Sequence, residues 1–429
     1  MSLLSSLYTG STGMQASTLD LSVIGDNIAN ANTVGFKGSR AAFEDALSQT
    51  LIGDSGQVGL GVGVASVRTI LTQGSLTNTG VATDLALQGN GLFVLKGAHQ
   101  GQDGTYYSRA GQFTTDKDGY LVNLEGLRVQ GYGADQTGVL LSGGLGDVKI
   151  GGASAAPRAT GNVTIRGNLQ ADAAIKPAWD PANPDTTSNF STSAQVFDSL
   201  GTVHQVSVYF RRTGAGAWEY HASTDGAGVT GGTAGTPFEI AAGTLTYDAN
   251  GKLTDQTQTG TFQPVGASSP QALTLNLGDP TSTARNTGLA GLTQFSATSA
   301  VSFLGQDGAA SGTVTSVRVE TDGNIVGAFS NGESRVLGQV AVATFSAPDE
   351  LARAGGNLYS RGPNAGEPSV GTAGTGGRGS ISAGALEQSN VDLGTEFVKM
   401  ISAQRQFQAN SKTIMTADSL LAELIQIKR

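Results

Sequence analysis

The two ends of the chain carry apolar residues at seven-residue intervals. The N-terminal series is Leu7, Met14, Leu21 and Ile28, and the C-terminal series is Leu393, Met400, Phe407, Ile414 and Leu421. A seven-residue repeat is typical of helices that pack along one seam. We therefore expect one helix near each end, with both series contributing to helix–helix contacts.

The faces opposite these apolar series are uncharged. In the C-terminal segment they carry Gln404, Gln406, Gln408, Asn410, Ser411 and Thr413. Solvated helix faces usually carry charges, and chain ends fray unless something docks on them. Two surface helices packed on the chain's own core are the simpler interpretation for a generic globular protein, whereas the uncharged faces favour packing against further copies of the chain.

Between the ends, short apolar stretches alternate with turn sequences. Gly89–Gly91 precedes Leu92–Leu95, and Asp118-Gly119 precedes Tyr120–Val122. Glycine after Asn or Asp between apolar stretches is typical of β-hairpins. The predicted fold class is therefore mainly β with terminal α-helices, in which the two helices pack as a coiled-coil-like core beside two β-rich outer domains.

Proline and glycine indicate where these domains meet. Residues 1–156 contain no proline, whereas eight of the eleven prolines lie between Pro157 and Pro280. We expect a nested, discontinuous arrangement. It consists of a helical core domain of residues 1–32 and 385–429, Gly-rich connectors at 33–80 and 361–384, a discontinuous β domain of 81–150 and 305–360, and an inserted outer β domain of 151–304.

Composition excludes several functional classes. The chain has no cysteine, so disulfide scaffolds, thiolate zinc sites and cysteine nucleophiles are excluded. Lys and Arg number 25 against 34 Asp and Glu, a formal charge of −9, which is unfavourable for binding nucleic acid. No apolar stretch approaches the 18 or so residues of a membrane span.

The same search finds no candidate catalytic, cofactor or metal site. The three histidines are scattered, and no G-x-S-x-G elbow is present. The Gly59–Val64 stretch lacks the glycine spacing and the following helix of a nucleotide loop. We therefore expect a protein that is not an enzyme, binds no cofactor and does not insert into a membrane.

Three segments carry a recognisable pattern. The first, Asn27–Lys37, contains Asn27, Asn30, Asn32, Gly35, Phe36 and Lys37, and the second, from Gly384 to Asn410, contains Ser389, Asn390, Val391, Asp392, Gln404 and Arg405. The third is Asp84–Phe93 followed by Ser108–Phe113. Together these segments resemble the bacterial flagellar rod and hook proteins, over about residues 1–135 and 320–429.

The resemblance implies an extracellular axial subunit of the flagellar hook or basal body. Such a subunit is exported unfolded by the flagellar type III apparatus, which fits the absence of any Lys or Arg before Lys37 and hence of a conventional cleaved signal. It also implies a helical homopolymer with the terminal helices in the inner tube. The implied partners are further copies of the chain, flagellar rod proteins, a hook cap and hook–filament junction proteins.

The length of the middle favours the hook-type members of this family. Rod-type members are usually shorter, and Val196–His204 is similar to a segment of the hook-type outer domain. The resemblance then implies a curved, flexible tube that transmits motor torque from rod to filament. A distal rod subunit is the alternative within the family. A secreted β-rich adhesin or hydrolase whose terminal helices merely dimerise is the alternative from another class.

Overall fold

The computed structural model describes residues 3–46, 49–50, 57–141, 143–283 and 286–427. The chain divides into two compact units. The first unit comprises Met1–Gly152, Ser316–Ala328 and Ser334–Arg429, and the second comprises Ala153–Thr315 and Phe329–Glu333. The predicted fold class, mainly β with terminal helices that pack together, is confirmed.

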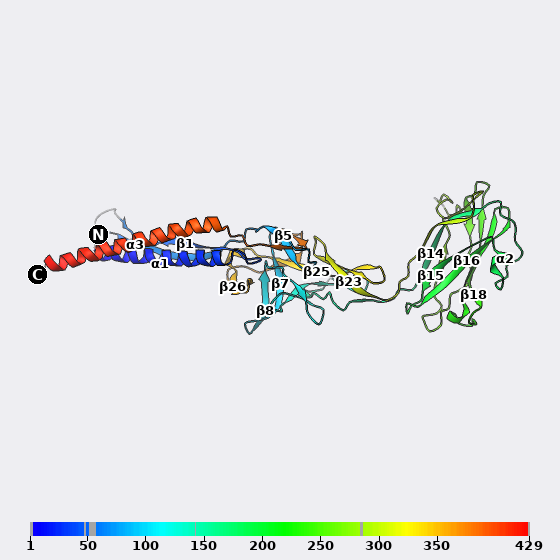
Figure 1. Cartoon of the computed structure of the whole chain (residues 1–429), viewed down its shortest axis with the longest axis horizontal. Helices are drawn as coiled ribbons and strands as arrows, with labels where there is room; N and C mark the ends of the chain where they lie inside the picture. The colour runs from blue at the N-terminus through cyan, green and yellow to red at the C-terminus, as the bar shows by residue number, and fades with distance from the viewer. Residues whose placement is uncertain (1–2, 47–48, 51–56, 142, 284–285, 428–429) are drawn as a thin grey trace. The chain divides into compact units, whose positions relative to one another are not determined.

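The first unit contains two long helices, α1 (Leu3–Ala29) and α3 (Leu393–Ile427). They run side by side in opposite directions, so the first residues of α1 lie beside the last part of α3 (Figure 1). Small residues line the contact between them. A Cβ atom added at Gly10 would lie 2.8 Å from Ile414 Cγ1, and one added at Gly13 would lie 2.6 Å from Asn410 Nδ2.

The seam between α1 and α3 therefore differs from the predicted apolar series. The buried residues of α1 include Ala16, Ser17, Ile24 and Asn27, and those of α3 include Glu396, Ala403 and Ala417. Glu396, Ala403, Asn410 and Ala417 also recur every seven residues, but they are small or polar. The seven-residue period of α3 is thus used within the chain by a different set of residues.

A two-stranded ribbon follows α1 and contacts it. Its strands are β1 (Ser39–Asp45) and β4 (Val62–Thr69), which pair antiparallel with Ser39 opposite Thr69. The ribbon lies in the segment that we expected as a Gly-rich connector. Glycine here also permits close packing, because a Cβ atom at Gly61 would lie 2.2 Å from Thr12 Oγ1 of α1.

The β part of the first unit is built on one twisted sheet. Its central strands follow the order β24-β25-β11-β7-β8-β27-β26. Their bounds are β7 (Leu92–His99), β8 (Gln102–Ser108), β11 (Arg128–Gly133), β24 (Asn324–Phe329), β25 (Ser334–Thr344), β26 (Ala352–Gly355) and β27 (Leu358–Ser360). One core, which includes the fully buried Phe93, Phe113 and Val340, packs against this sheet.

Two small sheets join the segment before α3 to the beginning of the β region. Strand β29 (Ser380–Ala383) pairs with β6 (Leu85–Gln88), and β30 (Ala385–Glu387) pairs with β5 (Leu76–Asn78). The predicted connector at 361–384 also contains β28 (Ser369–Thr372), which pairs with β25. Both Gly-rich segments thus contribute strands to the folded unit, and α3 begins at Leu393, eight residues after the predicted start of the helical segment.

The second unit has two sheets around a single core. Strands β15 (Phe190–Phe197), β16 (Val203–Gly214), β17 (Ala217–Asp225), β18 (Pro237–Tyr247) and β19 (Leu253–Gln256) form an antiparallel sheet in sequence order. The other sheet has β14 (Asn162–Gln170) beside β20 (Thr274–Asn276), β21 (Leu292–Phe295) and β22 (Ala300–Gln306). Residues from both sheets, such as Ile165, Phe210 and Leu292, share one hydrophobic cluster.

Candidate functional site: a buried junction below the terminal helices

The three sequence motifs meet at one place in the first unit. The first motif begins in the last turns of α1 and continues through a turn, in which Gly35 adopts a positive φ of 69°. A Cβ atom at Gly35 would lie 2.4 Å from the backbone nitrogen of Ala110, in the internal motif. The Gly35 backbone N–H donates to the carbonyl of Glu387, in the C-terminal motif, at 2.7 Å. Only glycine fits this close, left-handed position.

Asn27 fixes the way the chain leaves α1. Its side-chain oxygen accepts from the backbone N–H of Ser39 at 2.8 Å, and its amide donates to the carbonyl of Ser39 at 2.8 Å. The same amide donates to Glu396 Oε2 of α3 at 3.2 Å. Asn27 is 3% exposed. This one buried amide therefore joins α1, the first strand of the ribbon and α3.

Phe36 and Lys37 are also held by the β part of the unit. The Arg353 guanidinium lies 5.1 Å from the centre of the Phe36 ring and also donates to the carbonyl of Lys37. Arg353 pairs with Asp26 of α1 at 3.3 Å. A cation over an aromatic face is a stabilising contact. Arg353 of strand β26 thus holds the chain segment directly after α1 in place.

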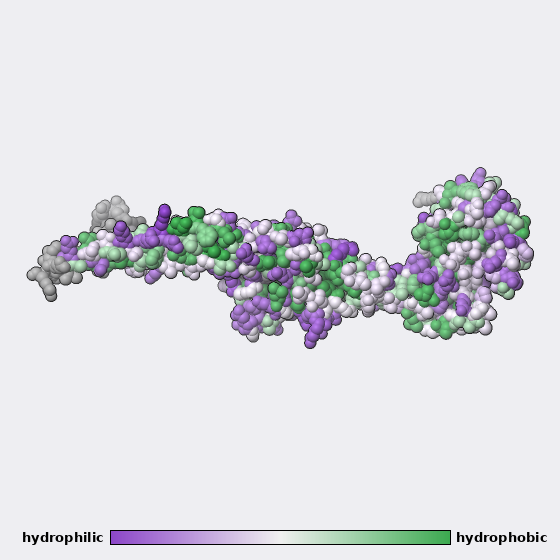
Figure 2. Space-filling model, in the orientation of Figure 1, coloured by the Kyte–Doolittle hydropathy of each residue, from purple (hydrophilic) through white to green (hydrophobic). Residues whose placement is uncertain are grey.

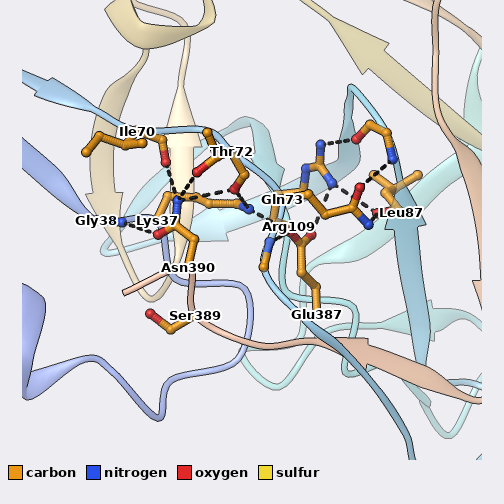
Figure 3. A network of polar contacts seen from close by, with 12 residues as sticks. Lys37, Gly38, Ile70, Thr72, Gln73, Leu87, Arg109, Glu387, Ser389 and Asn390 are labelled. Atoms are coloured by element: carbon orange, nitrogen blue, oxygen red, sulfur yellow. Dashed lines mark hydrogen bonds and ion pairs between the residues drawn. The ribbon is translucent and has the colours of Figure 1, made fainter. Parts of the chain in front are cut away.

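A fully buried ion cluster lies below these contacts (Figure 3). Lys37 Nζ lies 2.6 Å from Glu387 Oε1, and Arg109 Nη1 lies 3.0 Å from Glu387 Oε2. The side chains of Lys37 and Glu387 are 0% exposed and that of Arg109 is 4% exposed. Burial lowers the pKa of the Lys37 ammonium, although the hydrogen bond to Glu387 opposes this shift.

Asn390 links the C-terminal motif to the ribbon. Its side-chain oxygen accepts from the Gly38 N–H at 2.9 Å, and its amide donates to the carbonyl of Ile70 at 2.7 Å (Figure 3). Both ends of the amide therefore hold the backbone beside the start of β1 and the end of β4. The neighbouring Val391 lies close to Gly38, where its Cγ2 atom would be 3.2 Å from an added Cβ.

Asp392 begins α3. Its carboxylate accepts from the Thr395 backbone N–H at 2.7 Å, and this bond, together with the Thr395 hydroxyl, lowers the pKa of Asp392. A carboxylate at this position satisfies one of the free N–H groups of the first turn. The hydroxyl of Ser389 accepts from the Val391 N–H at 3.3 Å. The four residues from Ser389 to Asp392 thus form the entry of the chain into α3.

Other predicted motif residues lie outside this junction. Asn32, Gln404 and Arg405 are exposed. Asn30 donates to Asp26 Oδ1 at 3.1 Å and accepts from the Thr33 hydroxyl at 3.1 Å, so it shapes the turn after α1 locally. The junction therefore uses Asn27, Gly35, Phe36, Lys37 and the Ser389–Asp392 segment.

Sequence reasoning missed the two partners of Lys37. Arg109 and Glu387 both occur in recognised motifs, but they lie 278 residues apart, and Lys37 and Glu387 lie 350 residues apart. Spacing along the chain cannot reveal an ion pair at such separations. The available signal was chemical: each of the three motifs contains a charged residue, namely Lys37, Arg109 and Glu387.

The predicted apolar series lies at the margin of the helix pair. Leu7, Met14, Leu21, Ile28, Met400, Ile414 and Leu421 are half-buried, whereas Leu393 and Phe407 are exposed. Met14 and Phe407, one from each helix, line a surface groove of about 530 Å³. Their role in contacts between subunits stays a prediction.

A second apolar surface covers the first half of α3. Phe397 is 50% exposed, Val398 68% and Ile401 52%, and Leu393 lies on the same part of the helix. Figure 2 shows hydrophobic surface gathered over this part of α3. We call Leu393, Phe397, Val398 and Ile401 the α3 patch. Exposed apolar groups gathered in this way mark interaction sites more often than single ones do.

The described residues contain no helix long and apolar enough to cross a membrane. Within the same part of the chain, no three His, Asp or Glu side chains gather in an arrangement that would hold a metal ion. The exposed apolar surface on the helix pair instead indicates a site of contact with another surface.

Comparison with known proteins identifies the family. Four family models match: the flagella basal body rod protein at residues 7–37, the flagellar hook protein FlgE/F/G D1 domain at 86–171, the flagellar basal body protein FlaE D2 domain at 168–309, and the flagellar basal body rod FlgEFG protein C-terminal region at 382–427. The chain is 34% identical to the flagellar hook protein FlgE of Escherichia coli over 97% of this chain and 98% of that protein. It is 35% identical to the flagellar hook protein FlgE of Treponema pallidum over 99% of each.

The chain therefore belongs to the flagellar hook protein family. Among solved structures, it is similar to the crystal structure of the Helicobacter pylori flagellar hook protein FlgE2, with 17% sequence identity and a TM-score of 0.48 over 73% of this chain and 100% of that chain.

Proposed function

We propose that the chain is the structural, non-catalytic subunit of the bacterial flagellar hook and that it polymerises through α1 and α3. The observation that carries this proposal is the α3 patch, together with membership of the hook protein family. Burying one such side chain at a contact contributes on the order of 2 kcal/mol. A helix pair that leaves four of these side chains exposed gains stability when another subunit covers them.

The remaining surface of α3 suits a second role. Gln404, Arg405, Gln406 and Gln408 are exposed and form a polar stretch with one charge. In a tube built from these helices, such a surface would line a channel. A surface with a single charge among uncharged amides would let an unfolded chain pass while forming few ion pairs with it.

The second unit accounts for the outer part of the subunit. Its hydrophobic core is closed within the unit, so it does not need another subunit to be stable. We propose that these units form the outer layer of a curved tube and slide past one another as the hook rotates. In this arrangement torque passes from rod to filament through the joined helices.

The partners follow from this position in the flagellum. We propose contacts with rod proteins at one end of the hook and with the hook cap and hook–filament junction proteins at the other. We also propose that the subunit is extracellular and is exported by the flagellar type III apparatus without a cleaved signal.

Substitution within the α3 patch tests the polymer. Val398→Asp places a charge on the most exposed apolar residue of the patch and should abolish hook polymer in electron micrographs, while the monomer keeps its circular dichroism spectrum. The matched control is Leu200→Asp in the second unit, at a residue that is 65% exposed. Normal hooks from Val398→Asp would contradict the proposal.

Removal of the second unit tests its separate role. The Arg158 N–H and the Ala309 carbonyl lie 2.8 Å apart, so a short Asn-Gly turn can replace the residues between them. This variant should still polymerise but form tubes of altered curvature or stiffness. A curved tube from the full-length chain supports the hook assignment, a straight tube favours the distal rod alternative, and loss of all polymer in the deletion variant contradicts the proposed division of roles.

A further inference from the structure

Glu387 connects its own segment to three other segments of the chain from one buried position. Its carboxylate oxygen Oε1 accepts from Lys37 Nζ at 2.6 Å and from the Gly74 N–H at 2.8 Å. Its other oxygen accepts from Arg109 at 3.0 Å, and its backbone carbonyl accepts from the Gly35 N–H at 2.7 Å. One residue thus joins the exit of α1, the end of the ribbon, the internal motif and the segment that leads into α3.

The two cations also donate hydrogen bonds to the surrounding backbone. Lys37 Nζ also donates to the carbonyl of Thr72 at 2.6 Å. Arg109 donates to the carbonyls of Leu87 and Gly89 on either side of the end of β6. The carboxylate and both cations are therefore satisfied inside the protein, and their partners belong to different secondary-structure elements.

The charge of the cluster makes Glu387 different from its partners. Two buried cations share one buried carboxylate, so the cluster carries a net charge of about +1 when all three groups are ionised. Removing either cation leaves one neutral ion pair. Removing the carboxylate charge leaves two buried cations without a counter-ion, and an uncompensated buried charge is strongly destabilising.

We propose that Glu387 is a latch that makes the docking of the two terminal segments on the β domain a single cooperative step. Detachment of the segment before α3 leaves Lys37 and Arg109 buried without their carboxylate. Detachment of the segment after α1 removes the Lys37 and Gly35 contacts of Glu387, so the loss of either segment weakens the docking of the other. The α1–α3 pair is then either rigidly joined to the β domain or entirely released. This latch belongs to the single chain and does not depend on the proposed polymer.

The rival interpretation is two independent ion pairs that each stabilise their own surroundings. Hydrogen exchange on the full-length protein separates the two. In Glu387→Gln, the amide protons of Gly35 and Ser39 after α1, and those of Gln388 and Glu396 near the start of α3, should exchange at least a hundredfold faster and to the same extent. Amides of strands β16 to β18 in the second unit should keep their wild-type rates.

Two control variants keep this test specific. Glu367→Gln removes a comparable ion pair at the surface, where Arg361 and Glu367 are 51% and 76% exposed, and it should leave all rates unchanged. The triple variant Lys37→Met, Arg109→Met, Glu387→Met replaces the cluster by apolar groups and should restore much of the lost protection. Faster exchange at only one of the two terminal segments in Glu387→Gln would overturn the latch.

A second set of variants serves if Glu387→Gln does not fold. Lys37→Met and Arg109→Met each leave a neutral pair and should each raise exchange rates in the two segments by less than about tenfold. The double variant leaves a lone buried carboxylate, so its effect should exceed the product of the single effects by at least tenfold. A double effect equal to that product would show independent pairs and overturn the latch.

Discussion

The helix pair and the second unit differ in where their large apolar side chains lie. Among the described residues of the second unit, 22 buried ones, most of them from the two sheets, form one cluster that includes the fully buried Phe210, Trp218 and Tyr220. In the helix pair, small residues such as Ala403 and Ala417 are buried, whereas Phe397 and Val398 are exposed. The second unit has a closed core of its own, whereas the helix pair leaves most of its larger apolar side chains exposed or half-buried.

Buried apolar residues in the second unit therefore stabilise its own fold, whereas the exposed apolar residues of the helix pair are available for contacts with other subunits. A core made of large side chains stabilises its own unit, because it removes apolar area from water when the unit folds. Side chains that are already buried in this way have no apolar area left to bury against another subunit. A seam made of small side chains brings two helices close together but buries little apolar area. The helices therefore obtain their remaining stabilisation from the junction at one end and, as we propose, from neighbouring subunits.

The largest expected effect is a loss of stability confined to the second unit. Phe210→Ala removes a fully buried ring from its core and should lower the free energy of unfolding of that unit by about 3–5 kcal/mol. Both tryptophans, Trp179 and Trp218, lie in the second unit, so their fluorescence in a urea titration reports its unfolding. Circular dichroism at a helix-sensitive wavelength should report the helix pair unchanged, and a parallel loss of helix would show that the two regions are not independent.

A smaller loss of stability is expected when the close contact between the two helices is disturbed. Gly13→Val places a side chain where the added Cβ lies 2.6 Å from Asn410 Nδ2, and such overpacking typically costs about 1–3 kcal/mol. The helical signal should melt at a lower temperature while the tryptophan signal keeps its midpoint. Gly25→Ala is the matched control within α1, because no atom lies within 4 Å of its added Cβ. That control should stabilise the helix by about 0.5–1 kcal/mol.

The smallest expected effect concerns a carboxylate between the helices. Burial raises the pKa of Asp20 above its usual value of 3.8, the nearby Glu396 raises it further, and Lys399 opposes both. The folded pair therefore binds a proton more readily than the unfolded chain, so this residue's contribution to stability is fully present below pH 3.8 and is lost as the pH rises through the folded pKa.

Asp20→Asn tests this contribution directly. The variant should melt at a slightly higher temperature than the wild type at neutral pH, and the gap should close as the pH is lowered towards 4. The helical circular dichroism signal measures it. Equal melting at neutral pH, or a gap that widens on acidification, would contradict the proposed cost of burying this carboxylate.

The sequence predicts the existence of the helices better than it predicts their contact face. The seven-residue period of Leu393, Met400 and Phe407 correctly indicates α3. However, hydrophobicity cannot show that the helix turns Ala403 and Ala417 inward, because that choice depends on the glycines of α1 that allow a close approach. A pattern of apolar residues identifies a face with affinity for another surface, but not which surface covers it.

The same reasoning applies to the glycine-rich segments and the junction. Abundant glycine suggested connectors, yet Gly74 lies where an added Cβ would be 2.1 Å from the carbonyl oxygen of Gln388. Glycine serves close packing there, and composition does not distinguish this use from flexibility. The motif residues Asn27, Lys37 and Asn390 were found as a pattern, whereas their contacts depend on chain segments more than 300 residues away.

The antiparallel pairing of α1 and α3 also imposes an order of events on the chain. Asn27 contacts Glu396 across 369 residues, so the first helix gains its partner helix only when nearly all of these residues are available. Contacts between distant segments form late, since a long loop must close before they are gained. A chain that stops before residue 393 lacks α3 altogether. Completion of the helix pair thus requires that synthesis has passed through α3, and only chains that include this helix carry the surface through which we propose they join their neighbours.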